Sequence, residues 1–218
     1  MTSKEFEFNQ KIHSIILNPY LSSNNFDANC HLIRKYNIKN ISTTLNFLFY
    51  LRESLQNNDI TINALISYPF ADVPKIFINE LVSYAKDYGA NAIEYTPNFF
   101  SLSKDGDDVF ADEIENITNN KLPITLIFNS KNLPKDQFIR AINIALEIGI
   151  KNFQFGDGFG PTLSSNDLKE ILKIVGEQKF IKVVGKIKNL KQVVELLDVG
   201  ADCIGTANLN EIFQEIKL

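Results

Sequence analysis

One pattern recurs eight times along this chain and limits its fold more than any other feature. Each unit is a short apolar run followed by a longer stretch in which apolar residues recur at helical spacing. The apolar runs are KIHSIIL (11–17), NISTTL (40–45), INALISY (62–68), NAIEYTP (91–97), PITLIFN (123–129), NFQFGDG (152–158), FIKVVG (180–185) and DCIGTA (202–207). The helical stretches span 27–36, 46–57, 73–88, 105–119, 134–148, 164–177, 189–199 and 208–216. Alternating strands and helices build a parallel sheet, and eight such units close naturally into a barrel.

Residues that typically begin or end helices fall at the borders of these stretches. Three glycines follow a helical stretch, where a left-handed backbone favours glycine, and two prolines and two asparagines stand near helix starts. These residues are Gly89, Gly149, Gly200, Pro74, Pro134, Asn189 and Asn208. We therefore predict an α/β fold, a single-domain (β/α)8 barrel over residues 1–218. An open doubly wound sheet is the alternative, which the absence of G-x-G-x-x-G after the first run disfavours.

Charge and composition exclude several classes of protein. The net charge of −4 argues against a nucleic-acid surface, which needs clustered Lys and Arg. No apolar run reaches the length of a membrane span, and the first ten residues hold no secretory signal. Cys30 and Cys203 fall in unrelated segments, so we expect two buried free thiols, as suits a reducing compartment. We expect a soluble, cytoplasmic protein.

A metal site is not indicated. His13 and His31 have no partner at ligand spacing, and Asp107, Asp108 and Asp112 look like a solvated helix face. We expect neither a metal nor a cofactor.

The alternation of side chains along barrel strands predicts which of them enter the lumen. Bulky apolar residues must cover the helices, so Glu94, Gln154 and Lys182 should meet inside the barrel. A buried Lys and a buried Glu are each costly unless they pair. One interpretation is a structural ion pair that fills the barrel centre. We favour a functional site, because an apolar layer would fill a barrel at lower cost.

The same alternation assigns further positions. We expect Ala92, Thr96, Thr125, Ile127, Asn129, Asn152, Gly156 and Val184 to face inward. Those expected to face the helices are Ile93, Tyr95, Ile124, Leu126, Phe128, Phe153, Phe155, Ile181 and Val183.

Four segments resemble successive signatures of the deoxyribose-phosphate aldolase family. They are GANAIEYTPN (89–98), FQFGDGFG (153–160), IKVVGKIKN (181–189) and GADCIGTAN (200–208). HSIILNP (13–19) and ISYPFA (66–71) look like weaker versions of two N-terminal family segments. The resemblance spans roughly residues 11–210, and its specificity lies in the set and its order.

The resemblance implies a reaction and its residues. Members cleave deoxyribose phosphate to acetaldehyde and glyceraldehyde phosphate through a Schiff base on a strand-six lysine. A strand-seven lysine tunes that amine, and a strand-four aspartate takes part in proton transfers. Lys182 matches the strand-seven lysine, Glu94 the aspartate, Asn98 a position that often holds asparagine, and His13 an N-terminal aspartate. Gln154 stands where the Schiff-base lysine would be, and an amide nitrogen cannot form an imine.

Other positions depart from the family pattern. Phe155, Gly156 and Asp157 replace a Thr-Ser-Thr run, and Lys186 replaces a second glycine after strand seven. Lys182 is the one lysine expected to point inward, so it is the alternative nucleophile. A nearby carboxylate favours its charged form and burial favours its neutral form, and the sequence leaves that balance open.

The phosphate end of the family site is better preserved. Glycines fall at the ends of strands six, seven and eight, just before helix starts, where backbone N–H groups and the helix dipole bind phosphate. The residues that we expect to bind substrate or phosphate are Asn98, Gly158, Gly185, Lys186, Gly205, Thr206, Ala207 and Asn208. Lys186 could add a cation or crowd the site. Ordinary glycine turns are the alternative.

The sequence therefore supports an aldolase-like barrel that binds a small phosphorylated aldehyde or sugar, with Gln154 opposed to standard aldolase activity. One alternative is a carbon–carbon lyase with Lys182 as nucleophile and Glu94 as proton shuttle. A second is a non-catalytic ligand-binding or interaction barrel, and a third is an unrelated barrel enzyme. A homodimer is compatible with the sequence.

Overall fold

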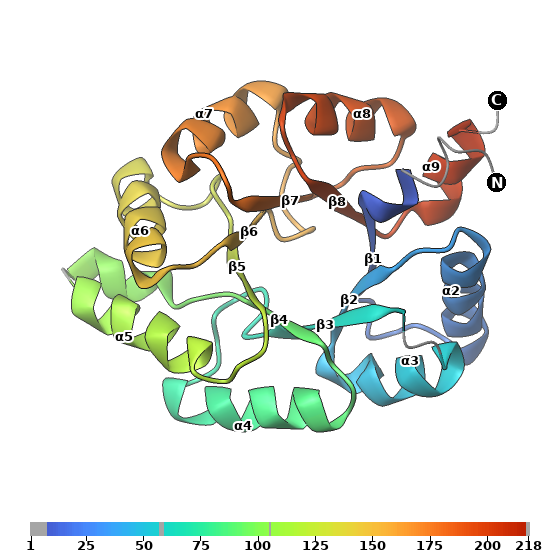
Figure 1. Ribbon diagram of the computed structural model, residues 1–218, viewed down its shortest axis with the longest axis horizontal. Helices are drawn as coiled ribbons and strands as arrows, with labels where there is room; N and C mark the ends of the chain where they lie inside the picture. Colours follow the sequence, from blue (N-terminus) through green and yellow to red (C-terminus); the bar gives the residue numbers. More distant parts are fainter. Residues whose placement is uncertain (1–7, 57–58, 105, 217–218) are drawn as a thin grey trace.

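The computed structural model describes residues 8–56, 59–104 and 106–216. Eight parallel strands close into one barrel in sequence order, and the helices form a ring around it (Figure 1). The strands are β1 (Ile12–Ile16), β2 (Asn40–Thr44), β3 (Thr61–Ile66), β4 (Ala92–Tyr95), β5 (Ile124–Phe128), β6 (Asn152–Phe155), β7 (Phe180–Val184) and β8 (Cys203–Thr206). Closure is direct, because β1 pairs with both β2 and β8. The predicted barrel is confirmed.

Each predicted helical stretch overlaps a helix. They are α2 (Ser23–Lys35), α3 (Leu48–Leu55), α4 (Lys75–Asp87), α5 (Asp107–Thr118), α6 (Lys135–Ile148), α7 (Ser165–Val175), α8 (Leu190–Val199) and α9 (Leu209–Ile216). Two short 3-10 helices, η1 (Leu45–Phe47) and η2 (Phe99–Lys104), were not predicted. Helix α2 begins four residues earlier than the apolar spacing suggested, because Ser22 caps it by accepting a hydrogen bond from Asn25 N–H.

The helix borders follow the expected chemistry. Gly89, Gly149 and Gly200 adopt positive φ angles of 92°, 96° and 124° directly after helices. Asn189 caps α8 by accepting from Gln192 N–H at 3.0 Å. Pro74 and Pro134 stand immediately before α4 and α6. Asn208 precedes α9, but its side chain donates to the carbonyl of Ile187 at 2.8 Å.

Aromatic packing confirms which strand residues face the helices. Phe128 packs on Phe153 and Phe155 within the sheet, and its ring centroid lies 6.0 Å from that of Phe138 on α6. The Tyr95 hydroxyl donates to Glu113 of α5 at 2.6 Å. The intervening residues of β4 and β6 therefore project into the lumen.

Three further expectations concern the described part of the chain. Cys30 and Cys203 are both buried and unpaired, as predicted. None of the helices described combines the length and apolar character that a bilayer crossing requires. No group of three or more His, Cys, Asp or Glu side chains gathers there in a way that could hold a metal ion.

Candidate functional site

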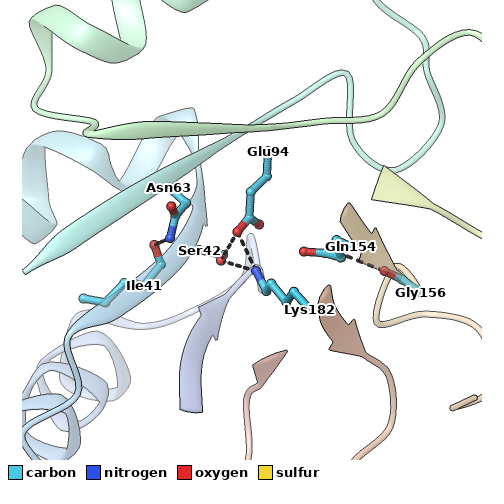
Figure 2. A network of polar contacts seen from close by, with 7 residues as sticks. All are labelled: Ile41, Ser42, Asn63, Glu94, Gln154, Gly156 and Lys182. Atoms are coloured by element: carbon cyan, nitrogen blue, oxygen red, sulfur yellow. Dashed lines mark hydrogen bonds and ion pairs between the residues drawn. The ribbon is translucent and has the colours of Figure 1, made fainter. Parts of the chain in front are cut away.

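A closed triangle of polar side chains fills the middle of the lumen (Figure 2). Lys182 Nζ on β7 lies 2.5 Å from Glu94 Oε1 on β4 and donates to Ser42 Oγ on β2 at 2.7 Å. The Ser42 hydroxyl in turn donates to Glu94 Oε1 at 2.9 Å. Lys182 and Glu94 are 1% and 2% exposed. The predicted pairing of the two charges in the lumen is therefore observed.

Strand register brings these residues to one level. Lys182 on β7 is the register partner of Gln154 on β6. Glu94 precedes Tyr95, which faces α5, so the Glu94 side chain points the other way, into the lumen. Ser42 is the member that sequence reasoning missed. The alternation along β2 did place Ser42 in the lumen, because Ser42 follows the fully buried Ile41 and so faces the opposite side of the strand. A serine in a strand is too common to single out by itself.

Gln154 has a defined orientation. Its Nε2 donates to the carbonyl of Gly156 at 3.0 Å. Because a carbonyl oxygen can only accept, this bond directs the amide nitrogen toward Gly156. Figure 2 shows the amide oxygen pointing instead toward the pair of Glu94 and Lys182. Gln154 thus presents an acceptor, not a nucleophile, to the lumen.

Several buried polar atoms in the lumen have no partner among the described residues. They are Gln154 Oε1, Glu94 Oε2, Thr96 Oγ1 and His13 Nδ1. Buried polar atoms in native proteins almost always find a hydrogen-bond partner, so these four atoms need partners that the described side chains do not supply.

Two titratable neighbours of Lys182 are held neutral. Burial, and then the positive charge of Lys182, keep the pKa of His13 well below its ordinary value, so its imidazole is uncharged near neutral pH. Burial raises the pKa of the Cys203 thiol, which pairs in register with Lys182. A protonated, buried thiol is a poor nucleophile, so the arrangement gives Cys203 no nucleophilic role.

Tyr68 spans the mouth of the barrel above this triangle. It follows β3, and its hydroxyl donates to the carbonyl of Asp157 in the loop after β6. Its ring lies 6.1 Å from that of Phe159 in the same loop. Burial, Asp157 and Glu94 together raise the pKa of Tyr68, which places its hydroxyl within the field of the lumenal carboxylate. Sequence reasoning missed Tyr68, because the contact joins two loops.

The glycines expected to bind phosphate have mixed surroundings. A Cβ on Gly185 would lie 2.8 Å from Thr162 Oγ1, and a Cβ on Gly205 would lie 2.7 Å from a methyl group of Val184. Packing alone therefore accounts for these two glycines. Gly158 has a φ of +80°, and a Cβ there would meet only ordinary contacts, 3.6 Å or more away.

Asp157 occupies part of the loop after β6. Its Oδ1 accepts from the N–H groups of Phe159 and Gly160, each at 2.9 Å, and its Oδ2 accepts from Asn129 Nδ2. Sequence reasoning noted Asp157 only as a departure from the family. Within the described residues, the N–H groups of Gly158 and Lys186 have no hydrogen-bond partner.

The remaining predicted binding residues lie around the mouth. Thr206 Oγ1 donates to the carbonyl of Ile187 and accepts from Asn208 N–H, both at 3.0 Å, so the loops after β7 and β8 are tied together. Lys186 and Ala207 are exposed. Asn98 is exposed and folds onto its own turn, where its Oδ1 accepts from Phe100 N–H. It does not approach the lumenal pair.

A cavity of about 490 Å³ lies at this end of the barrel. Its lining includes Leu17, Asn18 and Tyr20 after β1, Phe159 after β6 and Ala207 after β8. It has the size of a small-molecule site, which typically spans ~300–1,000 Å³.

Together these features define a (β/α)8 barrel with a polar lumenal site beneath its carboxyl-terminal loops. Comparison with known proteins shows which barrel proteins this chain is similar to. A deoxyribose-phosphate aldolase of Mycoplasmopsis pulmonis is 27% identical over 219 residues, covering 97% of this chain and 98% of that protein. The deoxyribose-phosphate aldolase of Lactobacillus acidophilus is 28% identical over 196 residues, covering 86% and 81%. No protein-family model matches the chain.

Solved structures agree in fold. A structure described as an aldolase superposes with a TM-score of 0.88 at 17% identity, covering 97% of this chain and 96% of that one. The deoxyribose phosphate aldolase of Aeropyrum pernix, described as tetrameric, gives a TM-score of 0.84 at 16% identity, covering 100% and 93%. The chain is thus similar to deoxyribose-phosphate aldolases in sequence over most of its length and in fold, and this is the resemblance that its motifs indicated.

Proposed function

We propose that this chain is a deoxyribose-phosphate aldolase-like barrel that binds a small phosphorylated aldehyde or sugar and is a very poor catalyst of the standard cleavage. The observation that carries the proposal is the state of Gln154. Its nitrogen is committed to Gly156, and it presents only a carbonyl oxygen to the lumen. The position that would supply the Schiff-base amine supplies an acceptor.

Lys182 does not readily take over that role. It is the one lysine in the described part of the chain whose side chain is buried. An amine must be neutral to attack a carbonyl, and Glu94 and Ser42 both bind the ammonium form of Lys182. The contacts that fill the lumen thus oppose imine formation.

One observation favours a second function. Glu94 Oε1 lies 2.5 Å from Lys182 Nζ, so the carboxylate is within reach to accept the ammonium proton directly. A carbon–carbon lyase that uses Lys182 as nucleophile and Glu94 as proton shuttle is therefore the competing candidate. This second function requires the ligand to compensate for the ion pair between Lys182 and Glu94, which is lost when the amine becomes neutral.

The phosphate end supports ligand binding. The N–H groups of Gly158 and Lys186 lack partners within the described residues. Lys186 follows β7, and the loops after strands seven and eight hold phosphate in many barrels. Exposed Lys186 adds a positive charge. The Asp157 carboxylate opposes phosphate binding, because its oxygen already accepts hydrogen bonds from two N–H groups of the loop after β6. We therefore expect weak phosphate binding, at about millimolar concentration.

Two measurements test the proposal. Calorimetric titration with deoxyribose 5-phosphate and with inorganic phosphate reports binding, and heat from both is expected. Borohydride reduction with acetaldehyde, followed by peptide mass spectrometry, reports an imine. We expect no adduct in the wild-type protein. An adduct on Lys182 that disappears in Lys182→Met would establish the competing lyase, whereas absence of any binding would reject both functions.

The oligomeric state also belongs to the proposal. Phe70, which lies five residues before the start of α4, and Ile76, the second residue of that helix, are 82% and 77% exposed. Exposed apolar side chains of this kind often contact another subunit, so we propose a homodimer. Sedimentation at several protein concentrations would measure it, and a monomer throughout would contradict it.

A further inference from the structure

The loop after β6 crosses the mouth of the barrel. Strands β1 and β3 each stand three strands away from β6 in the closed sheet. The loop nevertheless reaches the ends of both, since a Cβ on Gly158 would lie 3.6 Å from the Tyr68 hydroxyl after β3 and 4.0 Å from a Leu17 methyl group after β1. Phe159 lines the cavity at the mouth together with Leu17. The turn of residues 157–160 therefore lies over the lumen.

The side chain of Val184 fills the space between this turn and the charged pair. A Cβ on Gly158 would lie 3.6 Å from one methyl group of Val184. A Cβ on Gly205 would lie 2.7 Å from the other methyl group and 3.0 Å from Lys182 Cε. Neither Lys182 nor Glu94 belongs to the lining of the cavity at the mouth, and both are buried. Access to the pair from this end therefore requires the turn to move.

The turn is built as one unit. Asp157 Oδ1 accepts from the N–H groups of Phe159 and Gly160, each at 2.9 Å, and so closes the turn from within. Gly156, just before the turn, has a φ of +92°, and a Cβ there would lie 2.0 Å from the carbonyl oxygen of Val184, so this position requires glycine. Gly160 ends the turn. A rigid turn between two small, conformationally free residues is the arrangement of a hinged segment.

Few contacts hold the turn against the rest of the barrel. The Tyr68 hydroxyl donates to the carbonyl of Asp157, and Asn129 Nδ2 donates to Asp157 Oδ2. The Phe159 ring lies 6.1 Å from the Tyr68 ring, but Phe159 is 60% exposed and so buries little apolar area. A segment with few buried contacts opens at a low cost in free energy.

We infer that residues 157–160 form a lid, which closes the lumen in this structure, swings between Gly156 and Gly160, and is held closed by the Tyr68 hydroxyl. The inference goes beyond the proposed function and does not depend on it. The lid controls the access of water, and of any ligand, to the pair of Lys182 and Glu94 in the same way.

A thiol beneath the lid measures how often the lid opens. Val184→Cys nearly keeps the size of the side chain and places a thiol below Gly158. Cys30, which is buried on α2, reports any general loosening within the same molecule. Alkylation with N-ethylmaleimide, followed by peptide mass spectrometry, gives a rate for each position. When the lid closes faster than the thiol reacts, that rate is proportional to the open fraction.

Two tyrosine substitutions make a matched pair in this background. Tyr68→Phe removes the hydroxyl that holds the lid. Tyr95→Phe removes a hydroxyl that donates to Glu113 on the helix-facing side of β4. Tyr68→Phe should raise the rate at position 184, relative to Cys30, by about two- to tenfold, the value of one lost hydrogen bond. Tyr95→Phe should leave the ratio of the two rates unchanged.

The ratio decides the inference. An unchanged ratio in Tyr68→Phe would show that the loop is a fixed plug, and an equal rise in both tyrosine variants would show general loosening; either result overturns the lid. If Val184→Cys does not fold, the native Cys203, the buried register partner of Lys182, is compared with Cys30 in the same way. No ligand is present in these measurements, so failure of the lid leaves the proposed function standing.

Discussion

Lys182 and Glu94 lie on β7 and β4, and their charged atoms meet 2.5 Å apart in the lumen. Both side chains are almost fully buried, so each charge depends on the other. Glu94→Gln leaves an uncompensated buried ammonium and should lower the free energy of unfolding by about 3–5 kcal/mol. Urea unfolding followed by circular dichroism measures the change.

A double-mutant cycle shows whether the loss belongs to the pair. The combination of Glu94→Gln and Lys182→Met should cost less than the sum of the single changes, because the second removes the charge that the first leaves unpaired. The matched control is Glu170→Gln, which breaks the exposed pair of Glu170 with Lys173 on α7. It should leave the unfolding midpoint unchanged. If the losses of unfolding free energy from the two single substitutions add up to that of the double variant, Glu94 and Lys182 are not energetically coupled.

His13 gives the fold a dependence on pH. Its pKa in the folded protein is lowered well below 6.5 by burial and by Lys182, so the unfolded chain binds the proton more readily. The contribution of neutral His13 to the free energy of unfolding is therefore fully present above pH ~6.5. It is lost as the pH falls below that value, at up to about 1.4 kcal/mol per pH unit.

The slope can be assigned by substitution. Urea unfolding between pH 7 and pH 5 should show a smaller loss of stability in His13→Gln than in the wild-type protein. The control His31→Gln, at an exposed position on α2, should keep the wild-type slope. Identical slopes in all three proteins would mean that folding does not lower the pKa of His13.

Periodic features of the sequence predicted the fold and the lumenal charges. Alternation around the bulky residues Phe153 and Tyr95 was enough to place Gln154 and Glu94 inside, because strand geometry relates neighbouring residues directly. The contact of Tyr68 with Asp157 joins two loops 89 residues apart, and the periodic pattern of the sequence does not predict which loops meet. Hydrogen bonding within a loop also depends on local geometry, so the sequence did not predict that the Asp157 carboxylate would accept two N–H groups of the loop after β6.

Tyr68→Phe should loosen the mouth of the barrel. The change keeps the ring and removes the hydroxyl contact with Asp157, at a cost of about 0.5–1.5 kcal/mol. Hydrogen exchange should accelerate in the loop of residues 156–164, since the contact joins that loop to the segment after β3. Tyr20→Phe, at a side chain that is 92% exposed, is the control and should change neither quantity. Unaltered exchange in Tyr68→Phe would show that packing with Phe159 alone holds the loop.

The last prediction concerns the gain of aldolase chemistry. The wild-type protein should cleave deoxyribose 5-phosphate orders of magnitude more slowly than an ordinary deoxyribose-phosphate aldolase, because Gln154 cannot form the imine that divides the reaction into easier steps. Gln154→Lys restores an amine at the level of Lys182, whose positive charge would favour the neutral, nucleophilic form of the new side chain. We expect retro-aldol activity to rise by on the order of tenfold or more, with a borohydride-trapped adduct at position 154. Gln154→Met, which has no amine, should show neither. If the wild-type protein already turns over the substrate at family-like rates, and Lys182→Met abolishes both turnover and trapping, then Lys182 is the nucleophile and our interpretation of Gln154 is wrong.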